Sequence, residues 1–300
     1  MLALKKTEPY IMRKLLALTL IALVAFSSTA FSQSPPSTDI YVFDLKEAKR
    51  RVKLSNGKNM TDRDGYDNQP FFYATDLIMY SSHVDGQNDI FMLDLTTGEK
   101  TNLTNTPESE YSPHLITRTN SFAAVRVEAD GAQRLWQFDV DRKQAPNLIF
   151  DDLAPVGYHA WAGTDVAMFI LGDPVTLLLT NAKERKDQIL TSNIERTIKA
   201  AGRAFIIQKN EESGNNIYSV SGGRSVRLRK ITTLPKGATD WTLTPSGSYI
   251  TSVGSKVFKI NPQFDSAWSE IADLSDMGIQ NITRIAVSGD NSKIALVADR

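Results

Sequence analysis

The chain has 300 residues and contains no cysteine. It therefore forms no disulfide, has no thiolate nucleophile and cannot be lipid-anchored through a cysteine, so its stability must come from core burial. The chain also has no large excess of charge of one sign, since it holds 34 Lys and Arg and 34 Asp and Glu. Without the first 32 residues the counts are 30 and 33. A nucleic acid or an anionic membrane surface is therefore not expected as the partner.

The common catalytic signatures are absent as well. The sequence has no Gly-x-Ser-x-Gly elbow, no His-Glu-x-x-His, no phosphate loop and no dinucleotide fingerprint. We therefore expect a protein that is not an enzyme, with no catalytic residue, no cofactor and no metal.

Residues 1–32 have the composition of a secretory signal peptide. Lys5, Lys6, Arg13 and Lys14 precede an apolar run over 15–26, and small residues follow over 27–32. The 12-residue run is shorter than the ~20 residues of a membrane-spanning helix, so no span is expected after the signal is removed. Translation could also start at Met12. We predict a periplasmic or secreted protein with a linker over 33–38.

A strand pattern recurs along residues 39–300. It reads DIYVFDL from Asp39, DIFMLDL from Asp89 and RLWQFDV from Arg134, with weaker copies from Thr176, Asn216 and Lys256. A second apolar strand accompanies each copy, and Asp85-Gly86 predicts a type I′ turn between the two. Several strands per unit of 40 to 50 residues are typical of a β-propeller with four-stranded blades.

The two ends of the repeat region complement one another. The first two predicted strands match the third and fourth strands of a blade, whereas 282–288 and 293–299 match a first and a second strand. Their pairing would close a ring of six antiparallel four-stranded blades and remove both open sheet edges. We therefore predict an all-β, six-bladed β-propeller over 39–300, as a monomer, and expect deletion of 37–55 to cause aggregation.

The repeats resemble those of the TolB-like β-propeller family. That family's pattern of Ser-x-x-x-Asp-Gly-x-x-Asp-Ile-Tyr followed by Leu-Thr is matched nearly in full over 81–104, with Phe91 at the place of the Tyr, and 244–247 keeps most of its Ser-Pro-Asp-Gly turn. The resemblance covers the propeller alone, without the α/β domain that precedes it in TolB. It implies a binding module for a protein or a cell-envelope component.

Two groups of residues are candidate metal ligands. The segment 62–68 holds three aspartates but lacks the EF-hand spacing, so a solvated loop between blades is the preferred interpretation. His114 and His159 lie in adjacent blades and could converge or point apart, and no third ligand accompanies them. Polar residues between the blades are the preferred interpretation for this pair.

The mouth of the axial channel is the best candidate for a partner site. Acidic and aromatic residues near the starts of the predicted innermost strands could form a docking rim, because tyrosine and tryptophan are favoured at interfaces. The same loops could instead form a solvated funnel with no ligand, and the tryptophans could pack in the core. The candidate residues are Asp67, Glu110, Tyr111, His114, Tyr158, His159, Asp240 and Trp241.

Three functions remain open from the sequence. The preferred one is an exported, non-enzymatic propeller that binds a protein or envelope partner. The second is a carbohydrate lyase or a lactonase with a metal in the channel, and the third is a structural or sensory subunit whose partner supplies the chemistry. Metal analysis of the purified protein would separate the second from the others.

Overall fold

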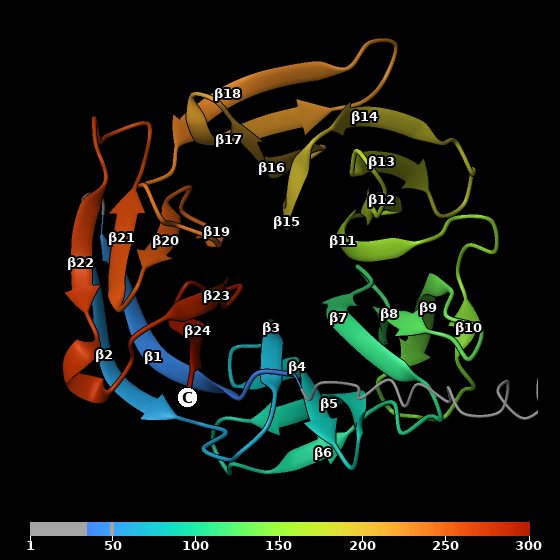
Figure 1. The fold of residues 1–300 in the computed structure, drawn as a ribbon, viewed down its shortest axis with the longest axis horizontal. Coiled ribbons are helices and arrows are strands. Elements are labelled where there is room, and N and C mark those ends of the chain that lie inside the picture. The colour runs from blue at the N-terminus through green and yellow to red at the C-terminus, as the bar shows by residue number, and fades with distance from the viewer. Residues whose placement is uncertain (1–34, 49–50) are drawn as a thin grey trace, which may run out of the picture. The chain divides into compact units, whose positions relative to one another are not determined.

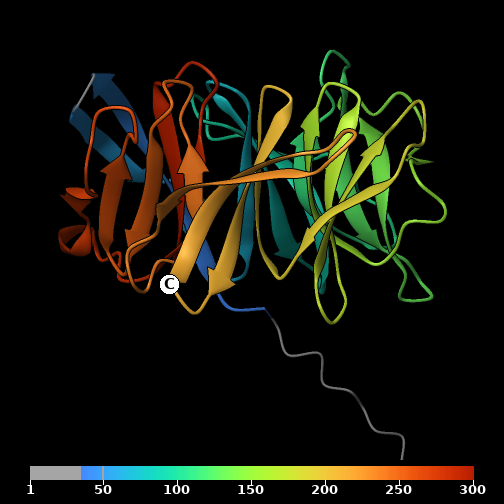
Figure 2. The same cartoon turned by 90° about the horizontal axis from the view of Figure 1, so that it is seen from above.

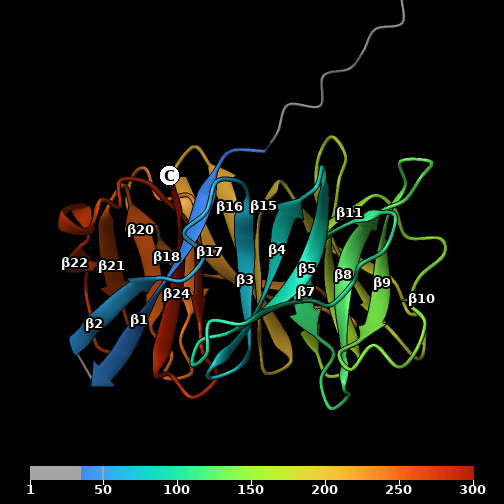
Figure 3. The ribbon, with the colours of Figure 1, turned by 90° about the horizontal axis from the view of Figure 1, so that it is seen from below.

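A computed structural model describes residues 35–48 and 51–300, and these residues form a ring of six β-sheets (Figure 1). Each sheet has four antiparallel strands, so the predicted six-bladed β-propeller is confirmed. The strands run between the two faces of the ring, as the side views in Figure 2 and Figure 3 show. The predicted leader over 1–32 lies outside the described residues.

The strands of the described residues follow one another in the order of the chain, with one short 3-10 helix before the last two. Their bounds are β1 (Thr38–Ala48), β2 (Arg51–Asn59), β3 (Asp67–Ala74), β4 (Leu77–Val84), β5 (Gln87–Asp94), β6 (Lys100–Asn102), β7 (Ser109–Leu115), β8 (Ser121–Val127), β9 (Gln133–Asp139), β10 (Asn147–Leu148), β11 (Val156–Ala162), β12 (Asp165–Ile170), β13 (Thr176–Asn181), β14 (Gln188–Ser192), β15 (Ile194–Ala201), β16 (Ala204–Glu211), β17 (Gly214–Ser221), β18 (Arg227–Thr233), β19 (Trp241–Leu243), β20 (Tyr249–Val253), β21 (Lys256–Ile260), β22 (Ser269–Asp273), η1 (Ser275–Met277), β23 (Ile282–Val287) and β24 (Lys293–Asp299).

Consecutive strands make up five of the blades. Blade 1 holds β3 to β6, blade 2 β7 to β10, blade 3 β11 to β14, blade 4 β15 to β18 and blade 5 β19 to β22. The sixth, called here the closing blade, holds β23 and β24 from one end of the chain and β1 and β2 from the other. In each blade the first of these strands is innermost, so β3, β7, β11, β15, β19 and β23 surround the axis (Figure 1).

The closing blade joins the two ends of the repeat region. Strand β1 pairs with β24 in an antiparallel register that sets Ile40 opposite Val297, and the blue and red strands lie side by side in Figure 3. Both residues are fully buried. The carboxylate of Asp39 also contacts the Arg300 guanidinium at 3.4 Å. The predicted closure is therefore confirmed, and apolar burial together with ladder hydrogen bonds stabilises it.

The hydrophobic core is divided among the contacts between blades. Each of six apolar clusters combines residues of two neighbouring blades. Phe43 and Ile294 of the closing blade, for example, pack with Ile250 of blade 5. The second strands have apolar residues on both faces because they lie between two neighbouring strands and two neighbouring blades.

The predicted turns have the backbone that their residues favour. Asp85 and Gly86 both have positive φ, at 53° and 86°, as a type I′ turn requires. Asn291 has φ 63° in the turn between β23 and β24, and Gly247 has φ 85° in the equivalent turn of blade 5, between β19 and β20. These short hairpins set the register in which consecutive strands of a blade pair.

Candidate functional site

A cavity of about 670 Å³ occupies the centre of the ring, and all six inner strands contribute to its wall. Near the start of each inner strand, a polar residue lines this cavity: Gln69, Ser112, Tyr158, Arg196, Asp240 and Arg284. Because every blade repeats the same strand order, these six residues lie at the same end of the channel. From there the wall continues to the turns at Gly202, Gly247 and Gly289.

Side chains cross the channel at the end where the inner strands start. Arg284 of β23 donates a hydrogen bond from Nη2 to the Tyr158 hydroxyl of β11, 3.3 Å away. These strands belong to the closing blade and blade 3, which are separated by two blades in either direction around the ring. Arg196 of blade 4 reaches the closing blade too, because its Nη2 donates to the Thr283 carbonyl at 3.0 Å.

The cavity wall carries more positive than negative charge. Three cationic residues, Arg196, Lys199 and Arg284, line it, and Asp240 is its one carboxylate among the described residues. Burial lowers the pKa of Arg196 and of Lys199, the neighbouring Arg284 charge lowers both further, and Asp240 acts in the opposite direction. The channel is therefore electropositive towards the end where the inner strands start, which is called here the crossed end.

The two channel histidines converge, with ring centroids 5.8 Å apart. His159 Nδ1 accepts a hydrogen bond from Trp161 Nε1 at 3.0 Å, so its Nε2 carries the proton and donates to the Ser112 carbonyl at 2.9 Å. Burial lowers the pKa of His159 to about 3 and that of His114 to about 4, so both rings are neutral at pH 7. Both nitrogens of His159 are thus used within the propeller.

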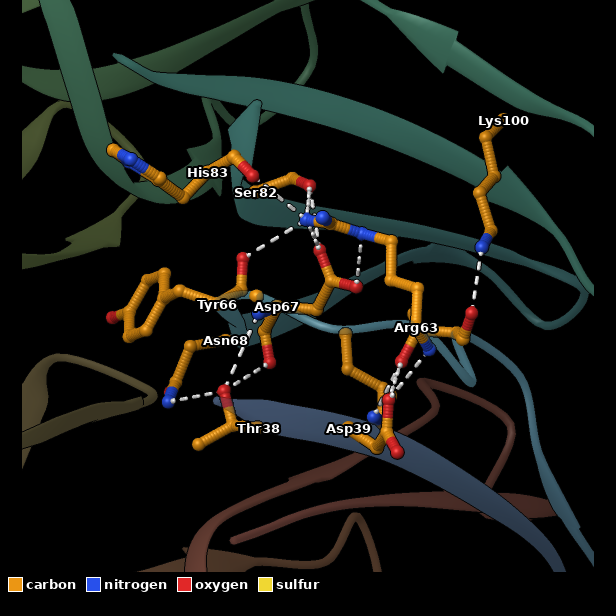
Figure 4. Close-up of polar contacts among 12 residues, drawn as sticks. Thr38, Asp39, Arg63, Tyr66, Asp67, Asn68, Ser82, His83 and Lys100 are labelled. Atoms are coloured by element: carbon orange, nitrogen blue, oxygen red, sulfur yellow. Dashed lines mark hydrogen bonds and ion pairs between the residues drawn. The ribbon is translucent and has the colours of Figure 1, made fainter. Parts of the chain in front are cut away.

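The three predicted carboxylates are buried and bonded inside the propeller. Asp67 accepts two bonds from Arg63, at 2.7 and 2.9 Å, and one from Ser82 at 2.5 Å (Figure 4). Glu110 accepts from Arg126 Nε at 2.9 Å and from the Thr106 hydroxyl at 2.5 Å.

Asp240 connects three blades. It accepts hydrogen bonds from the Thr197 hydroxyl of blade 4 and from the Ile285 amide of the closing blade, the latter at 2.9 Å. Asp240 therefore fixes inner strands of neighbouring blades to one another, whereas Asp67 and Glu110 bond to the second strand of their own blade and to the loop before it. All three are buried, so none forms an exposed rim.

The aromatic candidates occupy different environments. Tyr111 is half-buried and its hydroxyl accepts a bond from Asn88 at 2.6 Å, whereas Tyr158 faces the channel. Trp241 is fully buried in the core between blades 4 and 5, where it packs against Tyr249. Of the predicted residues, His114, Tyr158, His159 and Asp240 line the cavity.

The segment 62–68, a candidate calcium loop from the sequence, forms structural hydrogen bonds instead. Arg63 extends from it to Asp67, to Ser82 and to the His83 carbonyl, which links the approach to blade 1 with strand β4 (Figure 4). The Arg63 guanidinium thus occupies both carboxylate oxygens of Asp67, which a metal ion would need as ligands. In residues 35–48 and 51–300, no group of three His, Asp or Glu side chains is placed to hold a metal ion.

Sequence reasoning missed the three cationic residues of the channel. For two of them, the position along the strand could have indicated that they line the channel, because Arg196 and Arg284 lie near the start of their inner strands, as Tyr158 does. The position of Lys199 could not be predicted, since β15 pairs irregularly with β16 between Ile194 and Ile198.

The fold is similar to solved propeller structures. A protein described as TolB from Agrobacterium tumefaciens superposes with a TM-score of 0.68 at 13% identity, over 89% of this chain and 99% of that one. TolB from Acinetobacter baumannii gives 0.55 at 12% identity, over 87% and 64%. An oligogalacturonate lyase in complex with manganese gives 0.55 at 12% identity, over 83% and 82%.

The expected likeness to TolB propellers is thus confirmed at the level of the fold. No protein-family model and no curated protein sequence matches the chain. Within the described part of the chain, no helix has the length and apolar character needed to span a membrane.

Proposed function

We propose that this chain is an exported, non-enzymatic binding module that receives part of a protein or cell-envelope component in its central channel. One observation carries the proposal: a cavity of about 670 Å³ whose wall is built by all six blades. This volume lies within the range of pockets that hold small ligands or chain ends. The TolB-like fold and the signal-like leader agree with a role in the cell envelope.

A lyase is the second candidate function, because the manganese-bound oligogalacturonate lyase shares the fold. The converging pair His114 and His159 is the feature of this chain that would suit it. Against it, His159 uses one nitrogen for Trp161 and the other for Ser112, so it would have to leave both partners before it could bind a metal ion. The binding module is therefore preferred.

Site-specific photo-crosslinking in the producing cell tests the proposal. Ala200 is exposed and lines the channel, so a crosslinker placed there should give a discrete product with the partner. A crosslinker at Arg224, an exposed residue between β17 and β18, is the matched control and should give none. Absence of a product at Ala200, or the same product from both positions, would contradict binding in the channel.

Metal analysis and a lyase assay test the second candidate. The purified protein should hold no stoichiometric divalent ion after dialysis and should release no unsaturated product from oligogalacturonate. An ion retained at one per chain and lost in a His114→Ala, His159→Ala variant would favour the lyase.

A further inference from the structure

We infer that the channel holds an oxyanion-binding site next to its crossed end, in which Arg196 and Arg284 of that end, together with Lys199 three residues further along β15, hold a carboxylate or phosphate group of the ligand. The inference rests on the proposed function, because it names the chemical group that the channel receives.

The charges of these three residues are not balanced by the protein. Asp240 is the carboxylate of the cavity wall, yet its oxygens accept from Thr197 and Ile285, and it forms no ion pair with a cation in the described residues. Lys199 has neither a hydrogen bond nor an ion pair within the described residues, although it lies inside the channel. Like charges that are partly shielded from water repel one another, so a bound anion would stabilise this part of the channel.

The hydrogen-bond donors are held in place. Arg196 Nη2 and Arg284 Nη1 both donate to the Thr283 carbonyl, at 3.0 and 3.1 Å, which brings two guanidinium groups to one point. Arg196 Nε is buried with no hydrogen-bond partner in the described residues. The Tyr158 hydroxyl accepts from Arg284, so its own proton remains available for a further acceptor. Fixed guanidinium and hydroxyl donors suit the oxygens of a carboxylate or a phosphate.

The rest of the cavity wall indicates the polarity of the remainder of the ligand. Towards the turns, the cavity is lined by apolar residues such as Phe71, Leu243 and Val287. A ligand with one anionic end and a less polar body would place its charge among the cations and its body against this wall. A small organic acid, a phosphate ester or the carboxyl end of a chain would all meet this description.

Isothermal titration calorimetry with citrate and with inorganic phosphate, at low ionic strength, tests the inference. At least one of the two probes should bind at one per chain. Lys199→Met and Arg284→Met should each weaken that binding roughly tenfold or more, because each removes a charge-assisted contact. Tighter binding of citrate would indicate a carboxylate ligand, and tighter binding of phosphate a phosphate ester.

Arg224→Met is the matched control, because it removes the same charge from an exposed position and should change the affinity less than twofold. Lys199→Met keeps the test decisive if Arg284→Met does not fold, since Lys199 makes no hydrogen bond within the described residues. The inference is overturned if neither probe binds, or if the Lys199 and Arg224 variants bind the probe alike. A partner crosslinked at Ala200 together with absent probe binding would contradict this inference and leave the proposed function standing.

Discussion

Arg284 and Tyr158 lie 126 positions apart in the sequence, yet the Arg284 guanidinium donates a hydrogen bond to the Tyr158 hydroxyl at 3.3 Å. The contact joins the closing blade to blade 3 across the channel, so side chains rather than a loop narrow that end. Both residues lie near the start of an inner strand. The geometry of this end therefore depends on the ring being closed.

Tyr158→Phe separates the role of this contact from that of the Arg284 charge. The free energy of unfolding should fall by about 1 kcal/mol or less, because one hydrogen bond is lost and Tyr158 is only half-buried. Citrate or phosphate affinity should fall by about two- to twelvefold and by less than in Arg284→Met, since a hydrogen bond of a neutral hydroxyl contributes roughly 0.5–1.5 kcal/mol. Urea denaturation and calorimetry measure the two effects. A loss of affinity as large as that in Arg284→Met would mean that the Tyr158 hydroxyl holds the Arg284 side chain in place.

Ile40→Ala tests the closing blade. Ile40 is fully buried and packs in the cluster shared by the closing blade and blade 1, so its truncation should lower the free energy of unfolding by about 2 to 5 kcal/mol. Lys46→Ala on the same strand is exposed and should cost less than about 0.5 kcal/mol. Equal denaturation midpoints for the two variants would show that β1 does not complete the sixth sheet.

Glu110 should make stability depend on pH. Burial raises its pKa to about 7 from the ordinary 4.5, although Thr106 and Arg126 favour the ionised form. Because the folded state holds this proton more tightly than the unfolded state, the stability that the group contributes is fully present below pH 4.5 and is lost as pH rises through 7.

Glu110→Gln removes that titration. Relative to wild type, the variant should gain on the order of 1 to 3 kcal/mol between pH 4.5 and 7.5, measured by urea denaturation at each pH. Free-energy profiles of the two proteins that run parallel over this interval would show that Glu110 is ionised throughout.

The two channel histidines should stay neutral in mild acid. Burial lowers the pKa of His114 to about 4, with the Lys199 charge acting in the same direction, and that of His159 to about 3. Because both folded-state values lie below the ordinary 6.5, the stability that the neutral rings contribute is present above pH 6.5 and is lost as pH falls towards 4. In NMR spectra, assigned with His114→Gln and His159→Gln, neither ring should titrate between pH 8 and 5. A midpoint near 6.5 for either ring would show that water reaches it.

The fold could be predicted from the sequence because its signals are local and repeated. Local residue preferences alone predict the strand from Asp89, the Asp85-Gly86 turn and the apolar strand that ends near Ser82. The spacing of the copies then gives the number of blades. Ring closure followed because the predicted end strands were incomplete and complementary.

The candidate site was less predictable, because it depends on which side of each inner strand faces the axis. Asp67, Glu110 and Asp240 stand at the expected places, but Arg63, Arg126 and Thr197 bond to them and keep them inside the sheets. Those partners come from other strands or neighbouring loops, so the spacing along one strand could not reveal them. Trp241, in turn, packs against Tyr249 in the core.

The most direct test of the account is a crystal structure of the protein soaked in sodium selenate, with the anion located by the anomalous signal of selenium. The account predicts a peak at the crossed end of the channel, within hydrogen-bonding distance of Arg196 and Arg284 and near Lys199. An empty channel, with selenate bound only at the outer surface of the blades, would contradict it.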